Sequence, residues 1–154
     1  MDTQSYEARG IIEAPLDTVR ATFLRVTEGR VGPDNAPLLR GLPGAGRFMA
    51  GATLRGGPTS FTVHYGTHPG GTVEVGTSTF TFRGGYKFAA DHEFSAHERG
   101  TLLTYRAHNV APASHRDRAL VRAQFWLAGR LRIGLRGALR TIGGRLECHT
   151  EPDK

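Results

Sequence analysis

Residues 114–147 read SHRDRALVRAQFWLAGRLRIGLRGALRTIGGRLE, and this stretch decides the fold. Its apolar side chains recur every three or four positions, the spacing that places them on one face of a helix. The apolar stripe comprises Val121, Phe125, Ala128, Leu131, Leu135, Leu139, Ile142 and Leu146. We expect a helix over 115–142, which at about 1.5 Å per residue is roughly 40 Å long and spans a domain of this size. The rest of the chain must therefore pack against it.

Both ends of this helix have sequence signals. Pro112 excludes an earlier start, and Ser114 with Asp117 are suited to cap the first turn. Gly143 and Gly144 predict that the helix frays or ends there. Three further glycines at 129, 134 and 137 lower the helix propensity, so they either leave room for a ligand or a strand, or kink the helix.

The same stretch also carries the charge of the chain. Its eight arginines, at 116, 118, 122, 130, 132, 136, 140 and 145, outnumber Asp117 and Glu147 by six, which equals the formal net charge of +6 for the whole sequence. The arginines form a solvated face, dock an acidic partner such as an acyl carrier protein, or contact an anionic lipid or nucleic acid. We do not expect nucleic acid, because no aromatic residues are interleaved with the basic face.

Length and composition indicate an ordinary globular protein. The 154 residues, 38% hydrophobic and 22% charged, predict a single domain over 1–154 that can bury a core. No run approaches the roughly 18–20 apolar residues that cross a bilayer, and the first residues do not resemble a signal peptide. We therefore expect no membrane span and a cytoplasmic location. Cys148 is the only cysteine, which excludes an internal disulfide and a multi-thiolate metal site.

Upstream of the helix the pattern is typical of strands. Residues 6–12 alternate apolar and polar side chains as a half-buried strand does, and Pro15 then starts a short helix. Between 28 and 46, only residues 37–42 could form a further helical turn. Strand-like runs follow at 48–55, 61–66, 73–82, 86–96 and 102–110, separated by Gly-rich turns that favour antiparallel pairing. In the third run the apolar phase changes, which predicts a bulge or bend near Gly76.

This order of elements resembles the START-like superfamily, also called helix-grip or SRPBCC, which includes bacterial proteins named polyketide cyclase/dehydrase. The resemblance rests on YEARGIIEAPLDTVR at 6–20, GAGRF at 44–48, GTLLTY at 100–105 and the long closing helix. It implies an α+β helix-grip fold: a curved antiparallel sheet of six or seven strands wrapped around a long C-terminal helix, with an internal cavity for hydrophobic molecules. These are patterns of architecture, so they assign no catalytic residue.

The fourth strand-like run contains the best catalytic candidate. If its even positions face the helix, Tyr86, Phe88, Ala90, His92 and Phe94 line the interior, and His92 is the one titratable group among them. Desolvation would favour a neutral imidazole able to accept a proton near neutral pH. The alternative is a structural histidine that is hydrogen-bonded and partly buried.

Other strands and the helix complete the predicted site. In the last strand the odd positions place Tyr105 and Asn109 inside, and Tyr65 faces them from an earlier run. Gln124 lies in the apolar sector of the helix, where either a ligand or a strand must supply its partner. The alternative for the tyrosines is an ordinary core position with the hydroxyl at the rim. The candidate ligand-binding residues are Tyr65, Tyr86, Phe88, His92, Phe94, Tyr105, Asn109, Gln124, Phe125 and Ala128.

Metal and phosphate sites are not expected. His64 with His68, and His92 with His97, do not share a strand face, so the seven histidines do not suggest zinc. The loop at 41–46 lacks the Lys-Ser/Thr of a phosphate loop and leads into a strand. We expect no metal and no cofactor.

Three functions remain open at this point. The first is binding of a hydrophobic small molecule, polyketide-, lipid- or acyl-like, between the sheet and the C-terminal helix. The second is a cyclase/aromatase or dehydratase in which His92 is the general base and Tyr65, Tyr86 or Tyr105 orients a polyketide-like substrate. The third is a protein-interaction module that uses the Arg-rich helix.

Overall fold

The computed structural model describes residues 5–41, 51–65, 68–84, 88–109 and 118–153. Within these ranges it describes the backbone but not the side chains of 5–6, 40–41, 65, 68–69, 84, 88, 108–109 and 118–130. The elements in chain order are β1 (Ser5–Ile12), α1 (Leu16–Phe23), β2 (Gly29–Arg30), η1 (Pro37–Gly41), β3 (Ala52–Gly56), β4 (Ser60–Tyr65), β5 (His68–Val75), β6 (Thr79–Gly84), β7 (Phe88–His97), β8 (Gly100–Asn109), α3 (Arg118–Leu146) and β9 (Thr150–Asp153).

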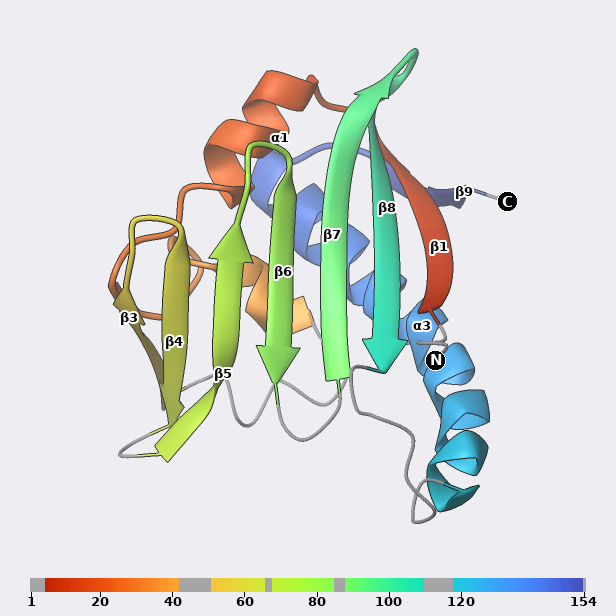
Figure 1. The fold of residues 1–154 in the computed structure, drawn as a ribbon. Helices are drawn as coiled ribbons and strands as arrows, with labels where there is room; N and C mark the ends of the chain where they lie inside the picture. Colours follow the sequence, from red (N-terminus) through yellow and green to blue (C-terminus); the bar gives the residue numbers. More distant parts are fainter. Residues whose placement is uncertain (1–4, 42–50, 66–67, 85–87, 110–117, 154) are drawn as a thin grey trace.

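The strands form one antiparallel sheet in the order β2-β3-β4-β5-β6-β7-β8-β1-β9. Consecutive strands from β3 to β8 are neighbours, and β1 then inserts between β8 and the C-terminal strand β9. The long helix α3 lies across one face of this sheet, where it contacts β1, β8, β9 and η1 (Figure 1). The predicted α+β class and helix-grip arrangement are confirmed.

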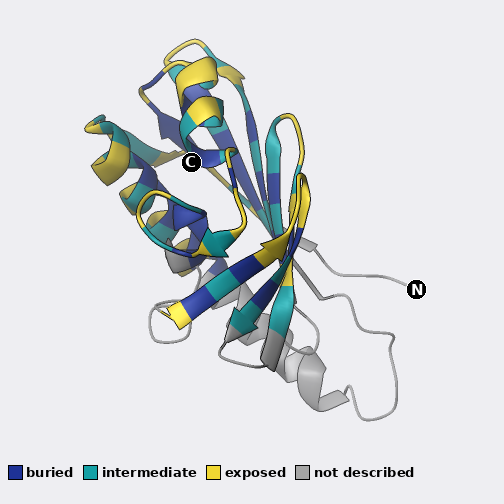
Figure 2. Cartoon of the chain, turned by 90° about the vertical axis from the view of Figure 1, so that its left-hand side faces the viewer, coloured by how far each residue is buried: buried dark blue, intermediate teal, exposed yellow. Residues whose placement is uncertain are grey.

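The core lies between the sheet and the helices, and Figure 2 shows the buried residues gathered there. In the described part of α3, Leu131, Leu135, Leu139 and Ile142 are all buried, as their helical spacing predicts. Gly10 of β1 lets the helix approach closely, because a Cβ at this position would stand 2.8 Å from Leu139 Cδ1. The apolar stripe thus fixes which face of α3 meets the sheet. No helix in the described ranges combines the length and apolar character that a membrane span requires.

The predicted strand over 73–82 is in fact two strands. Gly76 donates its N–H to the carbonyl of Thr79 at 2.9 Å, which closes a tight turn between β5 and β6. Of the bulge or bend predicted near Gly76, the bulge is therefore wrong, and the bend is a complete reversal of the chain. A hairpin turn explains the change of apolar phase, since Val73 and Phe82 on either side of it are directly paired.

Within the described ranges the sheet has nine strands, where the resemblance implied six or seven. One extra strand comes from the hairpin just described. Two more are the short strands β2 and β9, which contain two and four residues and lack the alternating pattern that reveals longer strands.

The helix end was also predicted wrongly. α3 continues through Gly143 and Gly144 to Leu146. Glu147 then adopts a left-handed conformation with φ of 51°, and Cys148 donates its N–H to the carbonyl of Gly143 at 3.2 Å. This is the hydrogen bond of a Schellman closure, which satisfies a carbonyl that the helix itself leaves free. The predicted capping residues Pro112, Ser114 and Asp117 lie outside the described residues.

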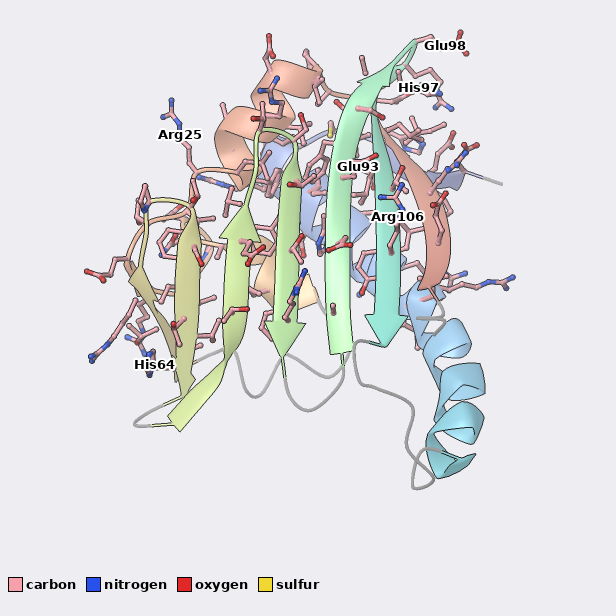
Figure 3. All side chains as sticks on the ribbon, viewed as in Figure 1. Arg25, His64, Glu93, His97, Glu98 and Arg106 are labelled. Atoms are coloured by element: carbon pink, nitrogen blue, oxygen red, sulfur yellow. The ribbon has the colours of Figure 1, made fainter. Side chains whose placement is uncertain are left out.

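Ion pairs connect neighbouring strands at the β1 end of the sheet. On the face opposite α3, Arg106 binds Glu7 at 3.0 Å and Glu93 at 3.3 Å, and Figure 3 shows Glu93 and Arg106 extending from neighbouring strands. Hydrogen bonds from Arg106, and to a smaller extent from Arg9, lower the pKa of Glu7. At the β7–β8 turn, Arg99 binds Glu13 and Glu151 together.

Candidate functional site

Three neighbouring strands bring Phe80, His92 and Tyr105 into one row. His92 of β7 is directly opposite Phe80 of β6 on one side and Tyr105 of β8 on the other. Side chains on a strand alternate between faces, so residues directly opposite one another share a face. All three are on the inner face, with exposed fractions of 0%, 1% and 0%. The predicted inward direction of His92 and Tyr105 is confirmed, whereas their functional roles stay predictions.

The ring of His92 is held by contacts on both sides. Its Nδ1 lies 3.2 Å from the carbonyl oxygen of Phe80. Since a carbonyl oxygen only accepts hydrogen bonds, this contact places the proton on Nδ1 and leaves a free lone pair on Nε2. The His92 ring meets Phe80 and Tyr105 edge to face, at centroid separations of 5.7 and 5.1 Å.

Burial keeps both polar groups of this row uncharged. Loss of hydration lowers the pKa of His92 from 6.5 to about 4, although the Phe80 carbonyl and the charge of Asp91 act in the opposite direction. Burial also raises the pKa of the Tyr105 hydroxyl well above its ordinary range. At neutral pH the row therefore presents a neutral imidazole and a neutral phenol.

Two atoms of this row lack hydrogen-bond partners. His92 Nε2 and Tyr105 OH are both buried, and neither finds a partner among the described residues. A buried polar atom without a partner costs about 1–3 kcal/mol, so native proteins rarely retain one without a reason. The pair marks a place in the core where a polar atom of another molecule would be stabilising.

Sequence reasoning missed two neighbours of the pair. Phe80 supplies the carbonyl that orients His92, and it could have been found only by recognising the turn at Gly76. Gly134 of α3 lies against the Tyr105 ring, since a Cβ there would stand 2.5 Å from the hydroxyl oxygen. Of the explanations considered for this glycine, close contact with a strand is the one observed.

The other predicted ligand-binding residues have different outcomes. Phe94 is buried on the inner face of β7, as expected. The backbones of Phe88 and Asn109 are directly paired across β7 and β8. The side chains that lie outside the described part are those of Tyr65, Tyr86, Phe88, Asn109, Gln124, Phe125 and Ala128.

A groove of about 650 Å³ lies at the edge of the sheet, where β1, β9 and α3 meet. No sequence signal pointed to it, because β9 was not predicted. It does not include His92 or Tyr105. Its lining residues are Glu7, Ala8, Arg9, Leu131, Arg132, Leu135, Arg136, Pro152 and Asp153.

Metal-binding side chains do not gather in the described ranges: no three His, Cys, Asp or Glu residues lie close enough together there to hold an ion. The described histidines are dispersed. His149, for example, lies just before β9 and 3.2 Å from Glu151, and β8 and β1 separate β9 from the strand of the buried His92.

Comparison with solved structures found a likeness, whereas two other comparisons found no match. No family model matches the sequence, and no curated protein matches it. A solution NMR structure of a Polyketide_cyc-like protein from Corynebacterium glutamicum is 15% identical and covers 94% of this chain and 90% of its own, with a TM-score of 0.43. The helix-grip assignment rests on the strand order and the position of α3 in this chain. The chain thus has the helix-grip architecture and is similar to a polyketide-cyclase-like protein.

Proposed function

We propose that this protein binds a hydrophobic small molecule, polyketide-, lipid- or acyl-like, between the inner face of the sheet and α3. The observation that supports this is the pair of buried atoms without partners, His92 Nε2 and Tyr105 OH, on directly opposite residues of β7 and β8. Tyr105 OH can donate to a ligand carbonyl, and His92 Nε2 can accept from a ligand hydroxyl. Small-molecule sites combine an apolar lining with a few such polar groups.

Binding is favoured over catalysis by the chemistry of His92. A general base works best when its pKa lies near the operating pH. With a pKa of about 4, His92 is a weak proton acceptor at neutral pH, although its Nε2 remains a good hydrogen-bond acceptor.

A cyclase/aromatase or dehydratase is the second candidate, because the His92 ring, whose Nε2 has no partner among the described residues, packs edge to face with the Tyr105 ring at a centroid distance of 5.1 Å. In that reaction His92 would remove a proton and Tyr105 would polarise a substrate carbonyl. The test is His92→Asn, which should abolish turnover of a polyketide-like substrate while folding and ligand binding persist. Unchanged turnover would remove His92 from the mechanism.

Native mass spectrometry of the purified protein, followed by denaturing extraction, tests the binding proposal directly. We expect a co-purifying molecule of hydrophobic character. Tyr105→Phe removes one hydroxyl and should lower the affinity for that molecule about 5- to 100-fold, the equivalent of one lost hydrogen bond to a buried group. Thr104→Val is the matched control, because Thr104 is the adjacent buried hydroxyl on the opposite face of β8. Equal affinity in both variants would overturn the proposal.

An acidic protein partner such as an acyl carrier protein fits the exposed arginines of α3. Arg132, Arg136 and Arg140 recur every four residues and are all exposed. A carrier docked beside the ligand site could deliver a tethered acyl chain. Binding of an acyl carrier protein at low ionic strength, weakened by added salt, is the expected result. Its absence at low ionic strength would exclude this partner.

A further inference from the structure

Among the described strands, β1 has a partner along its whole length on one side and along only half of its length on the other. β8 pairs with all of Ser5–Ile12, whereas β9 pairs only with Arg9–Ile12. Among the described strands, none pairs with Ser5–Ala8 on the β9 side. An unpaired strand edge of this kind is a template for another extended segment.

The direction of the backbone groups at this edge follows from a neighbouring hydrogen bond. Glu13 donates its N–H to the carbonyl of His149 at 2.9 Å, toward the β9 side. In an antiparallel ladder every second residue directs its N–H and C=O to the same neighbour. Glu7 and Ser5 therefore direct both groups to the side that β9 leaves open.

The groove at this edge carries positive charge that is not neutralised within the described part. Arg9 is paired with Glu7 at 2.8 Å. Arg132 and Arg136, on the α3 wall, are exposed and form no ion pair with described residues. Asp153, at the end of β9, is the other acid in the lining. Arg132 and Arg136 are thus available to bind carboxylates of another molecule.

We propose that this edge groove binds an extended acidic segment of a partner protein. The segment would continue the line of β9 antiparallel to β1, with backbone hydrogen bonds to Glu7 and Ser5 and with carboxylates near Arg132 and Arg136. A second copy of this chain is a poorer occupant, because it would bring a groove of the same positive charge to the interface. The inference rests on the β1 edge and the arginines of α3 beside it, and is independent of the buried His92–Tyr105 pair.

The test uses a fluorescent synthetic peptide that alternates glutamate and valine, with a lysine–valine peptide of equal length as the comparison. Fluorescence anisotropy should show binding of the acidic peptide only. Arg136→Glu should weaken this binding about tenfold or more, because it places a like charge in the groove. Arg55→Glu makes the same change of net charge on β3 near the far edge of the sheet, at an exposed arginine, and should leave the affinity within about twofold.

A backbone readout separates strand addition from simple ionic attraction. Glu7→Pro removes the N–H that faces the groove and keeps the β8 ladder, which uses the other residues of β1. It should weaken binding about tenfold, whereas Glu7→Ala, which keeps the N–H, should not. Hydrogen exchange at the Glu7 amide should slow when the peptide binds.

Several outcomes would overturn the inference. These are no binding of the acidic peptide, equal binding of the lysine peptide, equal loss in Arg55→Glu and Arg136→Glu, or binding that leaves Glu7 exchange unchanged. A dimer seen by light scattering, with Glu7 protected in the absence of peptide, would assign the edge to a second copy. Circular dichroism of each variant checks that the fold persists. If the proline variant unfolds, the test still rests on Arg136→Glu and on hydrogen exchange at the Glu7 amide.

Discussion

Gly134 of α3 lies directly against the hydroxyl end of Tyr105 in β8, with no room between them for a methyl group. A Cβ at position 134 would stand 2.5 Å from the phenolic oxygen and 2.7 Å from the ring carbon that bears it. The contact joins the long helix to the row of buried rings on the inner face. It also explains why a residue with poor helix propensity occurs in the middle of α3.

Gly134→Ala should destabilise the protein by about 1–3 kcal/mol, since the Tyr105 ring is buried and cannot move aside without strain. Gly144→Ala is the matched control in the same helix, because a Cβ there meets nothing within 4 Å. It should stabilise the protein by about 0.5–1 kcal/mol through helix propensity. Chemical denaturation measures both, and equal effects would show that Tyr105 does not limit the space at Gly134.

Tyr105→Phe should leave the ligand-free protein as stable as the wild type or raise its free energy of unfolding by up to about 1 kcal/mol. The reason is that the buried hydroxyl has no partner among the described residues, so its removal abolishes a desolvation cost. Urea denaturation of protein stripped of any bound molecule is the measurement. A clear loss of stability would mean that the hydroxyl is hydrogen-bonded in the free protein.

His92 should make the protein less stable in acid. Its pKa is about 4 in the folded state against 6.5 ordinarily, so between these values the unfolded chain binds more protons than the folded one. Stability contributed by the neutral form is present above pH 6.5 and is lost as the pH falls toward 4. The loss should amount to about 3 kcal/mol, from roughly 1.4 kcal/mol per pKa unit.

His92→Leu serves as the control for this pH dependence, because it removes the titrating ring and keeps the other titrating groups. The difference in unfolding free energy between wild type and variant should change by about 3 kcal/mol from pH 7.5 to 4. The carboxylates of Glu7 and Glu151, whose pKa values are lowered by arginine partners, lose stabilisation at lower pH in both proteins. A constant difference across this range would show that His92 is not buried in its neutral form.

Arg99→Ala should loosen β9 without unfolding the sheet. Arg99 joins Glu13, just beyond β1, to Glu151 in β9, while all three side chains remain partly exposed. Hydrogen exchange should become faster at the Glu13 amide, which is bonded to the carbonyl of His149. Arg145→Ala is the control. It removes the single ion pair between Arg145 of α3 and Asp34, and should leave the exchange rate of the Glu13 amide unchanged. Faster exchange in both variants would contradict a specific role for Arg99.

Part of the candidate site could be predicted from residue patterns alone. Alternation along 86–96 and 102–110 was sufficient to place His92 and Tyr105 on the inner face, because the period of a strand is fixed by its backbone. Their partners could not be predicted in the same way. Phe80 lies opposite His92 because the chain turns back at Gly76. In the sequence this turn appears only as a change in the apolar phase, which does not reveal that the chain reverses direction.

The sequence by itself determined the long amphipathic helix, the antiparallel strands and the inward direction of His92, since each follows from local periodicity. The tertiary structure alone decided the pairing of β9 with β1, the groove between them and α3, and the contact of Gly134 with Tyr105. These features depend on strand register and on where the helix crosses the sheet. Both are set by packing between segments far apart in the chain, which no local pattern encodes.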